Sequence, residues 1–514
     1  MDKKMNLKFF IIAVIMLIPL STVWAQGTMT DFLPRKYGGD PCFQTENDDN
    51  YFVWFAQPGW YGLIDKGFIV LPKNGGQSRE IFANHPLYWF VTCYEDDQNL
   101  VAIYRNDTKT TFEICLNIIP KDAQKYVWAP KTVWSIPKNE QLDFRVVSAV
   151  SPDKRKAGLA IFQMQFKTSN LQKVYMVSFD ENGMNNDLTL DIDFEGADLQ
   201  LIDFVVDDEA NLYTALLSYN KKEEKNGDIY ENETLHLYQC GEYGVQNSVE
   251  EEVDFGHVTG GKLLHTRNGK LVLGGYYATK PKGQETGCFF ATTSVADFND
   301  ISFSRQDFPN TYFDYKHSKT GQMAEEFHVY PIDFQEFSDG NIVLLGDMQA
   351  HWSDIAYYTI GGPILLHFAD MKGEINGFKT ITKNQSVVGQ SKSPTGMRES
   401  IFSYYALMDH DVIHLIFPVN IANFKGEPDK NLLVMGRVFG SGLDYDEACA
   451  AHCTVNSRQE VSAPELLMEY KTMNSYMIMP LFIENDGFIM YRSGKRTNMI
   501  SKLAYPLSPD IIQQ

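Results

Sequence analysis

Residues 444–453 group side chains that could hold a metal ion. Carboxylates, thiolates and imidazoles are the ligands that zinc and other transition metals take in proteins, and here they belong to Asp444, Asp446, Cys449, His452 and Cys453. The order Cys-x-x-His-Cys differs from the Cys-x-x-Cys-His of haem attachment, and no second cysteine pair completes a zinc site. A helical turn in a loop, or a local disulfide, explains the same residues without a metal. The segment is therefore only a metal candidate, and the sequence predicts no cofactor.

Residues 350–358 form the richest candidate for ligand binding. Aromatic rings can cover the apolar face of a sugar or peptide, and polar groups beside them can orient it. The candidate residues are His351, Trp352, Asp354, Tyr357 and Tyr358. In the alternative interpretation, the tryptophan and the tyrosines pack this loop onto its own sheet.

Two aspartates occupy equivalent places in an internal repeat. Asp203 and Asp333 each stand in an Ile-Asp-Phe sequence, eight residues before an asparagine. If both face one cavity, they could bind a cation or act as acid and base. If each accepts a hydrogen bond from neighbouring backbone, they are structural. A convergence of Asp203, Asp333 and Glu336 on one pocket would favour glycoside hydrolysis.

The elements that would position these residues are short strands joined by polar turns. Seven Asp-, Asn- or Gly-rich turns recur near residues 97, 154, 209, 268, 340, 410 and 486, and such residues close tight hairpins. A second turn follows most of them after about 30 to 35 residues, which gives two hairpins, and so four strands, in each repeat.

This repeat resembles the β-propeller superfamily in period and turn chemistry, without the motifs of a particular family. The resemblance implies an all-β fold of four-stranded blades; the seven turns favour seven blades, and six or eight are the alternatives. The last repeat lacks a strand, so we expect the N-terminal segment to close the ring, for example with residues 67–71 or 79–82. Two β-sandwich domains are the alternative, but the chain has no Pro/Ser/Gly-rich linker near its middle.

The first 25 residues have the parts of a secretory signal peptide. Three lysines precede the apolar run of residues 9–20, and small residues precede a cleavage point after Ala25. The run is too short to span a membrane. We therefore expect an exported protein, periplasmic or extracellular, without a transmembrane anchor after cleavage. A lead-in of residues 26–50 and a single propeller domain of residues 51–514 would follow.

The net charge of the chain and the lengths of its connections limit the kinds of partner that we expect. A net charge of −21 disfavours non-specific binding to nucleic-acid phosphates, so no nucleic acid is expected. Long connections at residues 219–232, 277–287, 347–363 and 419–431 would all emerge on one face of a propeller, here called the long-loop face, where binding function concentrates. The leading hypothesis is a non-catalytic propeller that binds a protein or glycan ligand through this face. A carbohydrate-active enzyme with channel-facing carboxylates and a structural subunit of a cell-envelope assembly are the alternatives.

Overall fold

The computed structural model describes most of the chain as β-strands. The described residues are 28–35, 40–58, 63–83, 88–165, 171–181, 183–190, 198–224, 227–241, 244–281, 283–309, 327–353, 357–383, 385–389, 404–427, 432–435, 447–470, 475–484, 486–494 and 498–505. Within them the one helical element is the short 3-10 turn η2 (Ile421–Phe424). The predicted signal peptide lies outside the described residues. The all-β prediction is confirmed.

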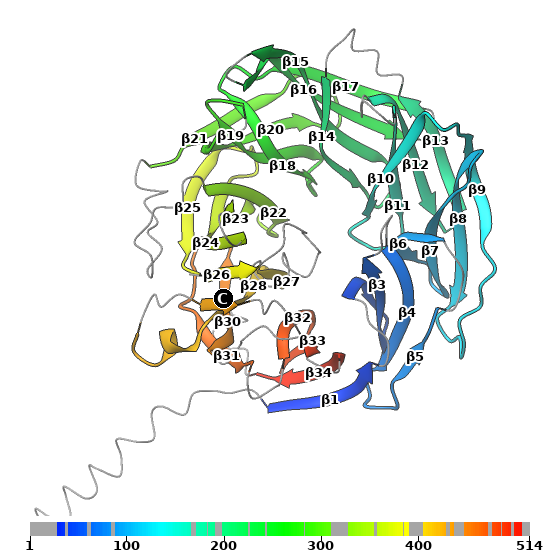
Figure 1. Cartoon of the computed structure of the whole chain (residues 1–514), viewed down its shortest axis with the longest axis vertical. Coiled ribbons are helices and arrows are strands. Elements are labelled where there is room, and N and C mark those ends of the chain that lie inside the picture. Colours follow the sequence, from blue (N-terminus) through cyan, green and yellow to red (C-terminus); the bar gives the residue numbers. More distant parts are fainter. Residues whose placement is uncertain are drawn as a thin grey trace, which may run out of the picture.

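The strands pair into four-stranded antiparallel units that follow one another around a common centre (Figure 1). This repetition is the architecture of a β-propeller. In chain order the units are: unit 1, β2 (Asp40–Glu46), β3 (Asn50–Pro58), β4 (Leu63–Pro72) and β5 (Arg79–Ile81); unit 2, β6 (Trp89–Glu95), β7 (Asn99–Asp107), β8 (Thr111–Pro120) and β9 (Lys131–Pro137); unit 3, β10 (Leu142–Val150), β11 (Ala157–Gln165), β12 (Leu171–Asp180) and β13 (Gly183–Leu190); unit 4, β14 (Asp198–Val206), β15 (Leu212–Glu224), β16 (Gly227–Gly241) and β17 (Gly244–Glu252); unit 5, β18 (His257–His265), β19 (Lys270–Ala278), β20 (Glu285–Ser294) and β21 (Ser302–Asp307); unit 6, β22 (Phe327–Glu336), β23 (Ile342–Ser353), β24 (Tyr357–Ala369) and β25 (Ile375–Ile381); unit 7, β27 (Tyr405–Asp409), β28 (Val412–Asn420), β30 (Ala448–Asn456) and β31 (Glu465–Glu469); unit 8, β32 (Ser475–Glu484), β33 (Gly487–Gly494), β34 (Asn498–Ala504) and β1 (Thr28–Arg35).

The described strands thus make eight units, so the predicted number of seven is not confirmed. Units 1 and 2 belong to one hydrogen-bonded sheet, but a single pair, Leu63 with Phe90, joins them. The seven predicted turns each connect the first and second strands of units 2 to 8. The unit that the sequence analysis missed has its turn at residues 47–49. There the side chain of Asn47 accepts the backbone N–H groups of Asp49 and Asn50, as Asp96 does for Gln98 and Asn99.

The middle strands are buried on both faces because each sheet packs against two others. Every residue of β28 is buried, and its sequence is a nearly continuous apolar run for that reason. Between units 4 and 5, for example, Tyr213 and Leu217 share a core cluster with Leu263 and Leu273. The molecule therefore has a ring of cores, one in each interface, rather than one central core.

The N-terminal strand completes the last unit. β1 pairs antiparallel with β34, from Thr28 opposite Ala504 to Arg35 opposite Asn498. Units 1 and 8 also share a core, and Tyr51 Oη donates to Glu484 Oε1 at 2.9 Å. The two segments that we expected in this role lie elsewhere: residues 67–71 belong to β4, and residues 79–81 form β5 beside it.

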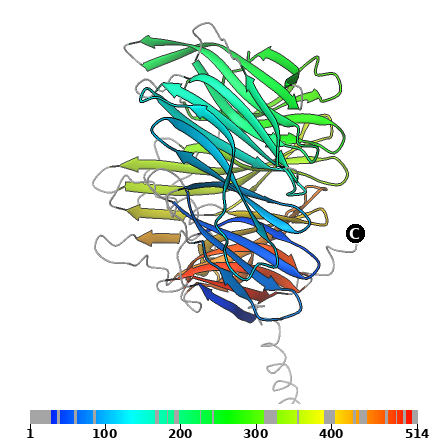
Figure 2. The same ribbon diagram turned by 90° about the vertical axis from the view of Figure 1, so that its right-hand side faces the viewer.

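Two of the four long connections extend the sheets instead of forming irregular loops. The β15–β16 hairpin continues in register to Glu224 opposite Gly227, and the β23–β24 hairpin continues to Ser353 opposite Tyr357. The outer part of β24 pairs with β26 (Gln385–Gly389), which pairs in parallel with β29 (Leu432–Met435), and residues 421–424 of the fourth connection form η2. In the side view, green and yellow-green strands project on one side of the ring (Figure 2).

Candidate functional site

Two pockets lie side by side on the long-loop face of units 4 to 6. The inner pocket has a volume of about 410 Å³ and lies between the first strands β14, β18 and β22. The outer pocket has a volume of about 810 Å³ and lies between the β19–β20 connection and β21. Gly283 and Glu285 line both, so the connection before β20 is the wall between them.

Two glutamate–histidine pairs line the inner pocket. His257 Nδ1 lies 2.6 Å from Glu233 Oε1, and Glu233 Oε2 accepts the backbone N–H of Val258 at 3.1 Å. The interface between units 5 and 6 repeats this contact. His328 Nδ1 lies 3.4 Å from Glu285, whose Oε2 accepts the backbone N–H of Val329 at 3.0 Å. The glutamate side chains are 5% and 4% exposed, whereas the histidines are 20% and 29% exposed. Each buried carboxylate therefore fixes the orientation of an imidazole that reaches the pocket.

The strand order creates these pairs. Each glutamate stands on the third strand of one unit, and its histidine is the first or second residue of the first strand of the next unit. Neither histidine was predicted from the sequence, although a signal existed: each is part of a His-Val pair that stands 12 residues before a turn glycine, Gly269 or Gly340. The glutamates gave no such signal, because they lie 24 and 43 residues from their histidines.

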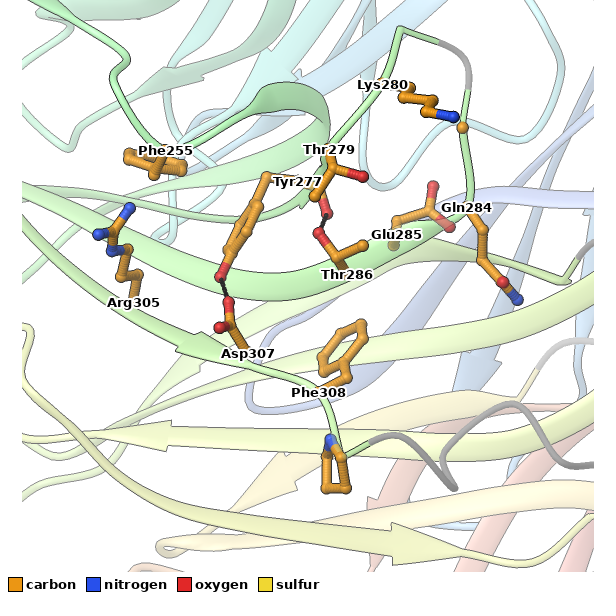
Figure 3. A pocket seen from close by; sticks show the side chains of 12 residues that line it. Phe255, Tyr277, Thr279, Lys280, Gln284, Glu285, Thr286, Arg305, Asp307 and Phe308 are labelled. Atoms are coloured by element: carbon orange, nitrogen blue, oxygen red, sulfur yellow. Dashed lines mark hydrogen bonds between the residues drawn. The ribbon is translucent and has the colours of Figure 1, made fainter.

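The outer pocket combines aromatic rings with charged and hydroxyl side chains (Figure 3). Tyr277 donates its hydroxyl hydrogen to Asp307, and burial, together with this bond, raises the pKa of the phenol well above its usual range. A Cβ at Gly287 would lie 2.3 Å from the Tyr277 hydroxyl oxygen, so glycine is what lets the ring cross β20. Arg305 lies over the ring of Phe255, 5.6 Å from its centroid.

Asp203 and Asp333 lie on equivalent first strands, as the repeat predicts, but each is bound to backbone. Asp203 accepts the N–H of Leu263 in the next unit at 2.8 Å, and Lys262 lies 3.8 Å away. Asp333 accepts the N–H of Phe334 at 2.9 Å and the side-chain amide of Gln335 at 2.6 Å. Glu336 likewise accepts the N–H of Arg267 at 2.9 Å. Burial raises the pKa of Asp203 and of Asp333. Each of the three carboxylates thus has a backbone partner, and Lys262 acts electrostatically on both Asp203 and Asp333. The glycoside-hydrolase alternative stays untested.

The aromatic candidates lie on the extended β23–β24 hairpin rather than in a loop. His351 and Trp352 are positions of β23, opposite Thr359 and Tyr358, and Tyr357 and Tyr358 belong to β24. Asp354 lies outside the described residues. The ligand-binding prediction for these residues stays a prediction.

The metal candidates separate on strand β30. Cys449 and Cys453 lie on one face of the strand and His452 on the other, because side chains alternate. Cys449 and Cys453 are both free thiols, so the predicted local disulfide and helical turn are wrong. Asp444 and Asp446 lie outside the described residues. Among the residues that the structure describes, no three potential ligands gather as a metal site would require.

A hydrogen-bonded Ser-His-Glu series crosses unit 4. Ser218 Oγ lies 2.7 Å from His236 Nε2, and His236 Nδ1 lies 3.2 Å from Glu250 Oε2. Catalytic serines use such a series. Here, however, Leu217 and Tyr219 line the inner pocket, and strand alternation turns the buried Ser218 to the opposite face of the sheet. The series is therefore outside the pocket.

The fold and this site define a β-propeller with two adjoining pockets on its long-loop face. No family model matches the chain, and no curated protein matches it in sequence. It is similar to the solved WD40 domain of SCAP from fission yeast, with 8% identity over 93% of this chain and 94% of that chain and a TM-score of 0.37. It is also similar to a GH93 alpha-L-arabinofuranosidase of Fusarium graminearum in complex with arabinobiose (10% identity, 71% and 93% covered, TM-score 0.28) and to a PL25 ulvan lyase (10% identity, 67% and 83% covered, TM-score 0.37). These structures differ too much from this chain to inform its function.

No helix in the described part of the chain is long and apolar enough to cross a membrane.

Proposed function

We propose that this protein is an exported, non-catalytic binding protein that takes a saccharide in the inner pocket of its long-loop face. The observation that carries this proposal is the pair of carboxylate-oriented imidazoles, His257 and His328, at one pocket. Rigidly held polar groups at the edge of a cavity are what gives a ligand its orientation. A volume of about 410 Å³ suits one or two sugar rings.

The other lining residues suit a sugar. Tyr219 and Tyr330 bring aromatic rings, and Tyr330 is 41% exposed. Gln200 and Thr259 bring an amide and a hydroxyl group that can exchange hydrogen bonds with sugar hydroxyls. A concave site of this kind favours a small ligand over a flat protein surface, so the glycan is preferred here to the protein ligand.

The binding of Asp203, Asp333 and Glu336 to backbone groups supports binding over catalysis. A carbohydrate-active enzyme needs two carboxylates at one scissile bond, and these three have other partners. An envelope subunit would need a large exposed apolar patch, and this alternative stays untested.

Export and ring closure are parts of the same proposal. Export is inferred from the signal-like residues 1–25 alone. Closure by the N-terminal segment is supported by the β1–β34 pairing and by the core that units 1 and 8 share.

A saccharide library tested against the purified mature protein would examine the proposal. We expect micromolar to millimolar binding of an oligosaccharide, which Tyr330→Ala weakens by about tenfold or more through the loss of a stacked ring. Met371→Ala is the matched control, because Met371 is 50% exposed but lies at the turn before β25, on the opposite face. Equal affinity of Tyr330→Ala and wild type would contradict the site. Shortened products after long incubation would contradict the absence of catalysis.

A further inference from the structure

The outer pocket holds two cationic side chains that no neighbouring carboxylate neutralises directly. Lys280 and Arg305 are both exposed and both line the pocket. Neither forms an ion pair with any carboxylate in the described part of the chain. Arg305 is positioned by the Phe255 ring beneath it, which leaves the edge of its guanidinium group to bind an anion in a bidentate manner.

The two carboxylates of the same pocket already have partners. Asp307 accepts the hydroxyl hydrogen of Tyr277. Glu285 is 3% exposed and accepts the backbone N–H of Val329 in the inner pocket. Glu285 is therefore directed to the inner pocket, whereas Asp307 is exposed and is the carboxylate that an entering ligand meets beside the two cations.

The rest of the lining suits a sugar ring. Thr279, Thr286 and Gln284 line the pocket together with the rings of Tyr277 and Phe308 (Figure 3). Hydroxyl and amide groups beside aromatic rings match the alternating hydroxyl and C–H faces of a saccharide. A purely electrostatic anion site would not need these rings.

We propose that the outer pocket selects an acidic saccharide, with Arg305 and Lys280, which lie on opposite sides of the pocket (Figure 3), binding its carboxylate or sulfate groups. This inference rests on the proposed function, because it specifies which saccharide the long-loop face takes. Gly283 and Glu285 belong to both pockets, so an oligosaccharide can place a neutral ring at the histidines and an acidic ring at the two cations.

Because the protein as a whole is negatively charged, any preference for an acidic saccharide must come from the side chains of the pocket itself. At −21, the protein as a whole repels anions, so an acidic sugar binds only where cations are concentrated. Removing the two pocket cations should therefore remove the preference for acid, whereas removing two other exposed cations should not.

Calorimetric titration at neutral pH and physiological ionic strength would test this. The probes are an oligogalacturonate, its fully methyl-esterified form, and a sulfated oligosaccharide with its desulfated form. We expect the wild-type protein to prefer one acidic probe over its neutral partner by about tenfold or more. Whichever acidic probe it prefers distinguishes a carboxylate from a sulfate. The variant Lys280→Gln/Arg305→Gln should bind both members of that pair alike, and the control Lys372→Gln/Arg458→Gln, which changes exposed cations at turns of the opposite face, should keep the preference.

The outcomes separate this inference from the proposed function. Equal binding of acidic and neutral probes by wild type, or a preference retained by the Lys280/Arg305 variant, overturns the acidic selectivity alone. The preference for the acidic probe could be lost in the Lys280→Gln/Arg305→Gln variant while Tyr330→Ala leaves binding unchanged. That result would overturn the proposed saccharide site in the inner pocket and would support the acidic selectivity of the outer pocket. No binding of any probe overturns both. Unchanged thermal unfolding of each variant would show that lost binding is not lost folding.

Discussion

Glu233 holds His257 across the joint between two units: Oε1 lies 2.6 Å from the imidazole Nδ1, and Oε2 accepts the backbone N–H of the next residue. Glu285 and His328 repeat the contact one joint further on. The same carboxylate therefore ties two sheets together and sets the orientation of a pocket side chain. The site is built from the joints of the ring, with the β19–β20 connection as a wall.

Replacement of Glu285 by glutamine should weaken both the joint and the site. The amide can still accept one N–H, but it loses the charge-assisted contact, and we expect a loss of about 1–3 kcal/mol in the free energy of unfolding together with weaker saccharide binding. Urea unfolding and titration measure the two effects. Glu374→Gln, at an exposed position, is the control and should change neither. A fully stable Glu285→Gln variant with unaltered affinity would show that the pair is dispensable.

A buried ion pair in unit 6 should be much more sensitive to single than to double substitution. Lys383 Nζ lies 2.7 Å from Asp347 Oδ1, and neither side chain is exposed. Burial lowers the pKa of Lys383 and raises that of Asp347. Lys383→Met leaves a buried carboxylate without its cation, so we expect a loss of about 3–5 kcal/mol, whereas Lys383→Met with Asp347→Leu should recover most of it.

Equilibrium unfolding of the two single variants and the double variant gives the coupling energy. The exposed pair of Arg155 and Asp97, at 47% and 78% exposure, is the control, and Arg155→Gln should cost less than about 1 kcal/mol. Additive losses in the Lys383–Asp347 cycle would mean that the two groups do not act as a pair.

Acid should destabilise the protein from about pH 6.5 downward, through buried imidazoles. Burial lowers the pKa of His367 to about 3, of His414 to about 4 and of His452 to about 3, from an ordinary value of 6.5. Between those values the unfolded chain binds a proton that the folded chain does not. Unfolding free energy therefore falls as the pH falls, by about 1.4 kcal/mol per pH unit for each group.

The slope of stability against pH, measured by denaturant unfolding from pH 7 to about pH 5, checks this sign. His367→Gln should reduce the slope of unfolding free energy against pH by the contribution of one titrating imidazole, about 1.4 kcal/mol per pH unit. A slope that does not respond to His367→Gln would assign the acid sensitivity to other groups.

Removal of the first strand should open the ring. Without residues 28–35, β34 loses its partner and becomes an exposed edge, and such edges pair with other chains. We expect a lower unfolding temperature and concentration-dependent association in size-exclusion chromatography. A chain that lacks only residues 1–27 is the control and should unfold like the mature protein. If the chain without residues 28–35 were as stable as the control, β1 would not be needed to close the ring.

The hairpin turns could be predicted from the sequence because each is closed by hydrogen bonds between residues that are close together in the chain. Asp207, for example, closes its turn by accepting the N–H groups of Glu209 and Asn211, and side chain and backbone lie within four residues of each other. The first unit was missed although Asn47 makes the same turn, because the strand before it, residues 40–46, has a single fully buried position. A strand that is largely polar and only half-buried carries little hydrophobic signal.

The sequence by itself determined the strand-rich repeat, most of its turns and the equivalence of Asp203 with Asp333, because these depend on residues close together in the chain. The tertiary structure alone decided what those aspartates bind, which strand completes unit 8, and that Glu233 and Glu285 reach histidines 24 and 43 residues away. Such contacts join different sheets, and their partners are fixed by how neighbouring units pack, a relation that no local spacing in the chain encodes.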